Sequence, residues 1–212
     1  ECKVTIDWIH SEKIDERNIE ERLQGLKGIL VAPGFGNRGI EGKIAAIQFA
    51  REKKIPFLGI CFGMQFAAVE FARNVLKLKD ANTTEVDAQT KNPVIDIMES
   101  QKSITRKGGT MRLGEYACAL TKGTKASHIY GRSKITERHR HRYEFNNDYL
   151  KRFEENGMTA AGTNPETNLV EIIELKNHPF FIGVQFHPEY KSTVENPHPL
   201  FVKFVRAAME QK

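Results

Sequence analysis

The fold is decided by the stretch Pro56-Phe57-Leu58-Gly59-Ile60-Cys61-Phe62-Gly63-Met64-Gln65. Proline ends the helix that precedes it, and the apolar run that follows it is typical of a buried strand. From Met64 to Val75, apolar residues recur at three- and four-residue steps, which predicts a helix. The sequence therefore predicts a buried strand that turns directly into a helix, with Cys61 at the junction.

A similar unit precedes this one. Residues 28–31 are an apolar run that ends at the loop Pro33-Gly34-Phe35-Gly36, and residues 41–53 have the apolar spacing of a helix. Strand, helix, strand and helix in this order are typical of parallel strands joined by crossover helices. We therefore predict an α/β fold with a mostly parallel central sheet flanked by helices, in a flavodoxin-like layering.

The other elements follow from shorter patterns. They are, in chain order, a strand over 4–9, helical apolar spacing over 14–23, short strands and loops over 77–130, two hairpin strands over 169–175 and 181–186, and a closing helix over 200–209.

Composition limits the function classes. A chain of 212 residues suits one well-filled core, so we predict a single domain over residues 1–212. No apolar run approaches the roughly 20 residues that span a bilayer, and the cysteines Cys2, Cys61 and Cys118 are too scattered for a disulfide framework. A cytoplasmic protein without a membrane segment is expected. The net charge of +5 permits nucleic-acid binding without requiring it.

Cys61 is the first candidate for chemistry. At the start of a helix, unpaired N–H groups and the helix dipole favour the reactive thiolate. Gly59 and Gly63 flank it, as small residues flank the nucleophile in the hydrolase pattern Gly-x-Ser-x-Gly. The structural alternative is a buried cysteine without chemistry, which on this residue alone is the stronger reading.

A thiol nucleophile needs a base and a group that orients the base. His187 lies where the strand 181–186 runs out at Pro188, and Glu189 is close enough in sequence to hold its imidazole. The backbone N–H groups of Phe62 and Gly34 are candidate donors to an oxyanion, because both follow strands that end at the same sheet edge. The loop around Gly34 lacks the phosphate-loop and dinucleotide patterns.

Taken together, these residues resemble a known family. The segments 59–65 and 185–189 resemble those of the class I, triad-type glutamine amidotransferases. The segments 33–39, 109–114 and 137–144 look like those of the glutaminase domain of CTP synthases, and 137–144 separates that branch from others. The resemblance covers nearly the whole chain.

The resemblance implies a role for each matching residue. Cys61 would be the nucleophile, His187 the general base and acid, and Glu189 its orienting carboxylate. Glutamine binding would involve Gly34, Phe62, Gly63, Met64, Gln65, Glu85 and Arg142. Arg142 can pair with the α-carboxylate of glutamine and Glu85 can accept from its α-ammonium. Without the resemblance, Glu85 would be read as a solvated loop acid, and residues 138–142 as a solvated strand or a phosphate or nucleic-acid patch.

The resemblance also implies partners. The domain would hydrolyse L-glutamine and deliver ammonia to a synthetase domain of the same polypeptide, a ligase that converts UTP to CTP with ATP and Mg²⁺. GTP would be an allosteric effector and the full-length protein a homotetramer. No metal or cofactor is expected in residues 1–212, and no nucleic acid or membrane as a partner.

The sequence departs from the family pattern at two places. Pro33 stands where relatives have the first of two glycines, and because proline has no N–H the oxyanion donor would have to be Gly34. Relatives also open with a further strand and helix, and with the synthetase domain, before the segment matched by residues 4–9. Three alternatives stay open: the glutaminase domain of another class I amidotransferase such as the GMP-forming one, a catalytically idle regulatory module of this fold, and a basic nucleic-acid binder.

Overall fold

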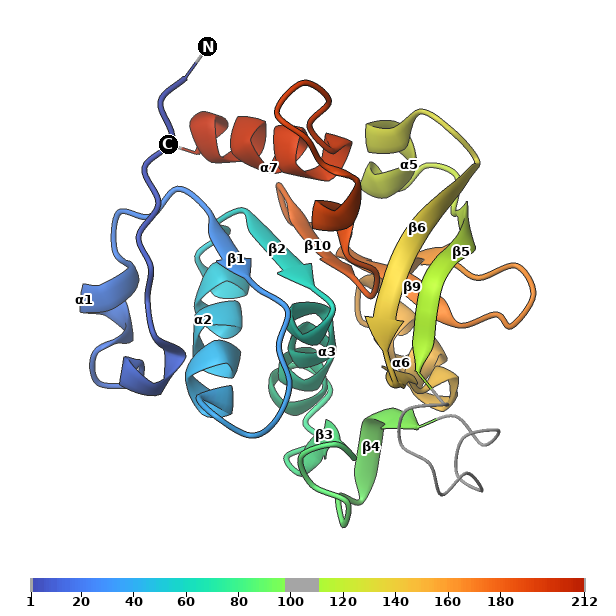
Figure 1. Cartoon of the computed structure of the whole chain (residues 1–212). Coiled ribbons are helices and arrows are strands. Elements are labelled where there is room, and N and C mark those ends of the chain that lie inside the picture. Colours follow the sequence, from blue (N-terminus) through green and yellow to red (C-terminus); the bar gives the residue numbers. More distant parts are fainter. Residues whose placement is uncertain (1, 98–110, 212) are drawn as a thin grey trace.

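The central feature is a seven-stranded sheet, shown in the computed structural model in Figure 1, which describes residues 2–97 and 111–211. Its strands run in the order β1 (Ile29–Val31), β2 (Phe57–Ile60), β10 (Phe181–Val184), β9 (Val170–Leu175), β8 (Met158–Thr163), β5 (Arg112–Leu120) and β6 (Lys134–His141). A separate three-stranded sheet has the order β3 (Ala81–Thr83), β4 (Asn92–Ile97) and β7 (Tyr143–Phe145).

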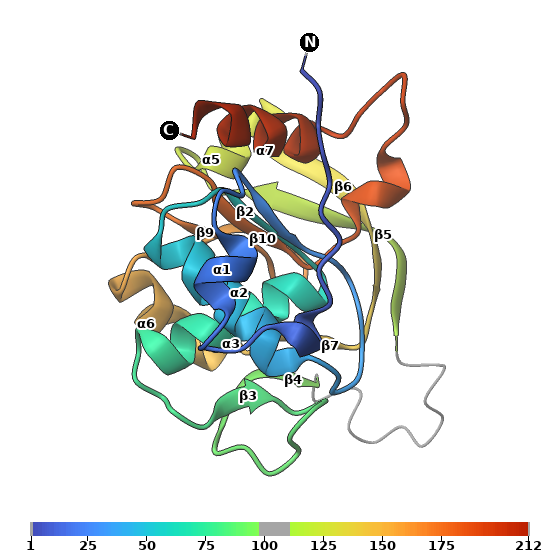
Figure 2. The same ribbon diagram turned by 90° about the vertical axis from the view of Figure 1, so that its left-hand side faces the viewer.

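Helices cover both faces of the large sheet (Figure 2). One face carries α1 (Ile19–Leu23), α2 (Ile40–Glu52), α3 (Phe62–Asn74) and α6 (Leu150–Glu155), and the other α5 (Lys125–Tyr130) and α7 (Pro199–Glu210). Within residues 2–97 and 111–211, short 3₁₀ turns lie at Ser11–Lys13, Asn147–Tyr149 and Pro188–Lys191. Each face has its own buried apolar cluster, so the sheet is covered on both sides.

The α/β class with flanking helices is confirmed, and the strand directions refine it. β1 and β10 both pair with β2 in parallel, as the strand–helix repeat predicts. The pairings of β10 with β9, β9 with β8, β8 with β5 and β5 with β6 are antiparallel. The described sheet is therefore mixed rather than mostly parallel. Short connections join β8 to β9 and β9 to β10 as hairpins, and such connections make neighbouring strands antiparallel.

Most predicted elements are present. The hairpin of β9 and β10, the helices α2 and α3 and the closing helix α7 are confirmed. The strand predicted over residues 4–9 is not formed. Val4, Ile6 and Trp8 there are 55%, 64% and 87% exposed, so the alternating apolar side chains have no sheet to pack on.

The middle of the chain is more regular than its sequence suggests. The segment predicted as short strands and loops contains the nine-residue β5 and the helix α5, which ends at a left-handed Gly131. Residues 109 and 110, the first two of the segment 109–114 on which the family resemblance partly rests, lie outside the described residues. Within the described part of the chain, no helix is long and apolar enough to cross a membrane.

Candidate active site

Cys61 sits at a strained turn between β2 and α3. Its backbone has φ 51° and ψ −101°, a region that side-chain-bearing residues rarely adopt. The Cys61 N–H donates to the carbonyl of Val184 on β10 at 2.7 Å, and its own carbonyl accepts from the N–H of Gln65 at 3.1 Å. The sheet on one side and the helix on the other hold this conformation, which presents the thiol at the sheet edge.

The glycines beside Cys61 are required for close packing rather than for backbone freedom. A Cβ at Gly63 would lie 2.2 Å from the carbonyl oxygen of Val31, and one at Gly59 would lie 2.7 Å from the Gly63 carbonyl. Neither distance is compatible with a side chain. These glycines therefore let α3 begin directly against the strands, while the left-handed backbone falls on Cys61 itself.

Burial dominates the electrostatics of the thiol. The Cys61 side chain is buried, which raises its pKa to about 12. The adjacent backbone N–H of Phe62 opposes this rise in pKa, whereas the charges of Glu144, Glu189 and Glu85 add to it. The expectation that the helix terminus would favour the thiolate is therefore outweighed by desolvation. The thiol needs a base to ionise at neutral pH.

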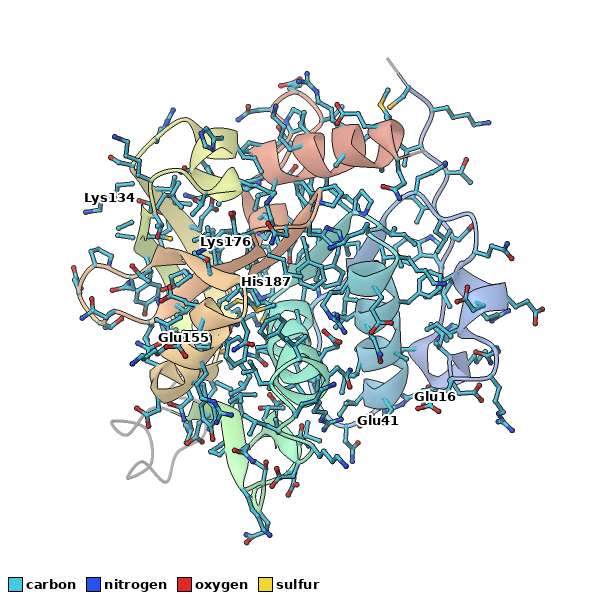
Figure 3. All side chains as sticks on the ribbon, turned by 180° about the vertical axis from the view of Figure 1, so that it is seen from behind. Glu16, Glu41, Lys134, Glu155, Lys176 and His187 are labelled. Carbon is cyan, nitrogen blue, oxygen red and sulfur yellow. The ribbon has the colours of Figure 1, made fainter. Side chains whose placement is uncertain are left out.

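An imidazole paired with a carboxylate lies on the adjoining loop. Nδ1 of His187 lies 2.6 Å from Oε1 of Glu189, and the imidazole is stacked on the ring of Tyr190. The His187 backbone N–H donates to the carbonyl of Arg138 at 2.8 Å. Because the carboxylate accepts from Nδ1, the neutral ring has an unprotonated Nε2, and Nε2 has no hydrogen-bond partner among the described residues. His187 is buried, and Figure 3 shows it near the centre of the view, whereas Glu16 and Glu41 lie toward the edge.

One cavity of about 480 Å³ collects most of the predicted site residues. It is lined by Cys61 and His187 together with Gly34, Phe62, Gln65, Glu85 and Arg142. Gly63 and Met64 are not in its lining. Gly63 packs against Val31, and Met64 is buried against Gly183, so these two residues support the turn and do not reach the cavity.

Glu85 is tied into the site and is not a solvated loop acid. Its Oε1 accepts from the N–H of Gly36 at 3.1 Å, which links the end of the β3 segment to the glycine loop. Burial raises the pKa of Glu85, while the Gly36 N–H and the charge of Arg142 lower it. A carboxylate and a guanidinium therefore face the same cavity from two different segments.

The basic run 138–142 divides into two faces. Along β6 the exposure alternates, so that His139 and His141 are buried whereas Arg138 and Arg140 are exposed. Arg142 follows the strand and is half-buried at the cavity. The run is therefore not one continuous basic patch.

A profile for the family described as glutamine amidotransferase class-I matches residues 1–207. The chain belongs to the class I glutamine amidotransferases. A CTP synthase of Cytophaga hutchinsonii is 70% identical over 98% of this chain, and one of Christiangramia forsetii is 62% identical over 99% of it. The solved glutaminase domain of Trypanosoma brucei CTPS, with bound acivicin, has a TM-score of 0.91 and 35% identity, covering 100% of this chain and 83% of that one.

These likenesses assign this amidotransferase to the CTP synthase branch, as its glutaminase domain. The chain spans 39% of the length of the Cytophaga relative and 38% of the Christiangramia relative.

The amidotransferase site also contains residues that the sequence did not single out. Tyr143 and Tyr190 line the cavity, and the carboxamide of Gln185 reaches the Cys61 sulfur at 3.6 Å. A signal for Gln185 was available, because an amide directly after the apolar strand 181–184 must find buried partners. Nothing in the sequence marked Tyr190, whose place depends on the 3₁₀ turn at Pro188–Lys191.

Behind the site, the amidotransferase fold buries an ionic cluster. Arg112 donates to Glu144 at 3.1 Å and to Glu171 at 2.7 Å, and His139 and His141 lie beside it with ring nitrogens 2.8 Å apart. Burial raises the pKa of Glu144 to about 8 in spite of Arg112, and it lowers the pKa of His139 to about 3. Burial therefore disfavours the charged form of these histidines, and one arginine faces two carboxyl groups.

Proposed function

We propose that this chain hydrolyses L-glutamine to glutamate and ammonia through a γ-glutamyl thioester on Cys61. One observation carries the proposal. Cys61 and the imidazole of His187 line the same cavity, and Glu189 holds the histidine tautomer that leaves Nε2 free to accept a proton. This is the arrangement that thiol nucleophiles need for acyl transfer.

The proton movements follow from the electrostatics. Because burial raises the pKa of Cys61 to about 12, the thiol is protonated at neutral pH, and Nε2 of His187 takes that proton. The sulfur attacks the side-chain amide carbon of glutamine. His187 then returns the proton to the nitrogen, the C–N bond breaks and ammonia leaves. Water, deprotonated by His187, hydrolyses the thioester to glutamate and regenerates the thiol.

Backbone donors stabilise the oxyanion in this proposal. The N–H of Phe62 is next to Cys61 in the chain and lowers the pKa of its thiol. Gly34 packs against the Phe62 ring, where a Cβ would lie 3.4 Å from it. Their N–H groups are assigned to the oxyanion, since Pro33 has none. Arg142 is assigned to the α-carboxylate of glutamine, Glu85 to its α-ammonium and Gln65 to its polar atoms, because all three line the cavity.

The role of the whole protein rests on the curated relatives. Their identity of up to 70% supports a domain that passes ammonia to a synthetase domain, which forms CTP from UTP with ATP and Mg²⁺. GTP as an effector, a homotetramer and a cytoplasmic location belong to the same proposal. Residues 1–212 would then be the single glutaminase domain. In the described part of the chain, no group of His, Cys, Asp and Glu side chains could hold a metal ion.

The test is turnover combined with labelling. Purified protein incubated with glutamine should release ammonia and glutamate in equal amounts, and Cys61→Ala should abolish this. Acivicin, which is bound in the Trypanosoma brucei domain, should modify Cys61 and spare Cys2 and Cys118 in peptide mass spectrometry. Equal labelling of the three cysteines, or turnover by Cys61→Ala, would contradict the proposal.

A further inference from the structure

Two buried carboxamides connect β7 to the nucleophile. Nε2 of Gln65 donates to the carbonyl oxygen of Tyr143 at 3.1 Å and to Oε1 of Gln185 at 3.2 Å. Nε2 of Gln185 in turn donates to Sγ of Cys61 at 3.6 Å. The contacts form a chain from a backbone carbonyl, through two amides, to the sulfur.

The first member of this chain fixes the orientation of the others. A backbone carbonyl can only accept, so Gln65 must present its NH₂ group to Tyr143. That NH₂ group also faces Gln185, which must therefore present its oxygen. The NH₂ group of Gln185 is then left on the side of Cys61. If Gln65 were turned over, its oxygen would face the oxygens of Tyr143 and Gln185. If Gln185 were turned over, its NH₂ group would face that of Gln65. Either arrangement leaves buried polar groups without a partner, which costs free energy.

The charges around the sulfur make this donor important. Glu144, Glu189 and Glu85 all disfavour a negative sulfur, and so does burial. Among the described side chains, that of Gln185 donates to the sulfur. The adjacent backbone N–H of Phe62 also lowers the pKa of Cys61, and both of these groups are neutral. Neutral donors stabilise a thiolate without adding a positive charge, which would disfavour protonation of His187.

We propose that Gln185 is a positioning residue for the nucleophile, whose N–H, oriented through Gln65 by the Tyr143 carbonyl, stabilises the charged form of the Cys61 sulfur. This inference rests on the proposed glutaminase function. Gln185 is 0% exposed and does not line the cavity, so it acts through Cys61 and not on the substrate.

The test measures thiolate reactivity separately from turnover. Iodoacetamide alkylation of Cys61 at pH 8 is followed by peptide mass spectrometry in the wild type and in Gln185→Met, which keeps the length of the side chain and removes the N–H. Loss of a hydrogen bond to a charged group should lower the alkylation rate by about tenfold. The kcat for glutamine should fall by a similar factor with KM changed less than about twofold.

A packing role for Gln185 predicts a different result. Loosening the core exposes a buried thiol, so alkylation would be unchanged or faster. Ile172→Val is the matched control, because Ile172 is also 0% exposed, lies on the neighbouring β9 and is outside the amide chain. It should lower the Tm and leave the alkylation rate unchanged. An unchanged or faster rate in Gln185→Met overturns the inference.

A second measurement does not depend on a variant of Gln185. In the nitrogen-15 NMR spectrum of the wild-type chain, the side-chain NH₂ signal of Gln185 should shift when Cys61 is alkylated. That of Gln48, which donates to Glu52 on α2, should not. The absence of a shift at Gln185 would overturn the inference. If wild-type Cys61 is alkylated and glutamine is hydrolysed, the proposed function is supported, whatever the results for Gln185. If glutamine is not hydrolysed, the proposed function itself fails.

Discussion

The ring of Tyr190 lies flat on the imidazole of His187, with ring centroids 4.8 Å apart and an interplanar angle of 6°. Tyr190 is 47% exposed and lines the cavity, so one face of the proposed base is covered by an aromatic ring at the edge of the cavity. Together with the Glu189 contact, the stack leaves the imidazole little freedom to rotate.

The stack gives a first prediction. Tyr190→Phe keeps the ring and should retain nearly the full kcat. Tyr190→Ala frees the imidazole and should lower kcat by roughly two- to tenfold, since stacked pairs contribute about 0.5–1.5 kcal/mol. Steady-state glutaminase assays on both variants make the comparison. Equal losses in the two would point to the Tyr190 hydroxyl instead of its ring.

A second prediction compares His187 with the carboxylate that holds it. His187→Ala removes the proton acceptor, and Glu189→Gln removes only the charge that orients it. We expect His187→Ala to lose most of the turnover and Glu189→Gln to lose less, because an orienting group usually contributes less than the base it orients. The kcat values of the two single variants decide this. A rate for His187→Ala close to that of the wild type would require another base.

A third prediction concerns Arg142 as the carboxylate-binding residue. Arg142→Ala should raise KM for glutamine about ten- to a hundredfold with a smaller effect on kcat, because a charge-assisted contact contributes about 1.5–3 kcal/mol. Arg142→Lys should recover part of this, since an ammonium keeps the charge without the planar fork. The exposed Arg138→Ala serves as a control from the other end of the basic run, with an unchanged KM expected. An unchanged KM in Arg142→Ala would remove the residue from the site.

A fourth prediction uses the buried cluster. Burial raises the pKa of Glu144 from its ordinary 4.5 to about 8. The folded protein therefore keeps a proton that the unfolded chain releases above pH 4.5. The contribution of Glu144 to the free energy of unfolding is largest below that pH and declines as the pH rises through 8. In Glu144→Gln there is no such proton, so its stability relative to the wild type should increase between pH 4.5 and 8.

Urea unfolding of both proteins between pH 5 and pH 9 measures this difference. Glu16→Gln, a change at an exposed carboxylate, is the control and should follow the wild type at every pH. Parallel stability curves for Glu144→Gln and the wild type would show that Glu144 carries no extra proton in the folded state.

The loops that meet at the cavity could be located from the sequence. Gly34, Cys61 and His187 each follow a short apolar strand, and strand ends of one sheet come together at its edge, so their convergence on one cavity could be predicted. The contacts of Gln185 could not, because they depend on how three separate segments orient two amides. Whether those residues carry the chemistry is what the experiments above test.

Two failures have a clear physical origin. Alternating apolar residues over 4–9 indicated a strand, but strand formation needs a partner, and the described chain provides none for this segment. The mostly parallel sheet was extrapolated from the first third of the chain. Strand direction depends on the connections, and in the second half short hairpin connections join β8 to β9 and β9 to β10.

The alternation along β6 has a consequence for the fidelity of folding. β6 ends the seven-stranded sheet and pairs with β5 from Ala119↔Lys134 to Arg112↔His141. A slip of one residue would turn Arg138 and Arg140 inward and expose His139 and His141. A neutral histidine can be buried at little cost, whereas burying an unpaired guanidinium costs free energy. The out-of-register pairing of β5 with β6 is therefore less stable at each of these positions. The alternation of arginines and histidines thus favours one register for the pairing of β6 with β5.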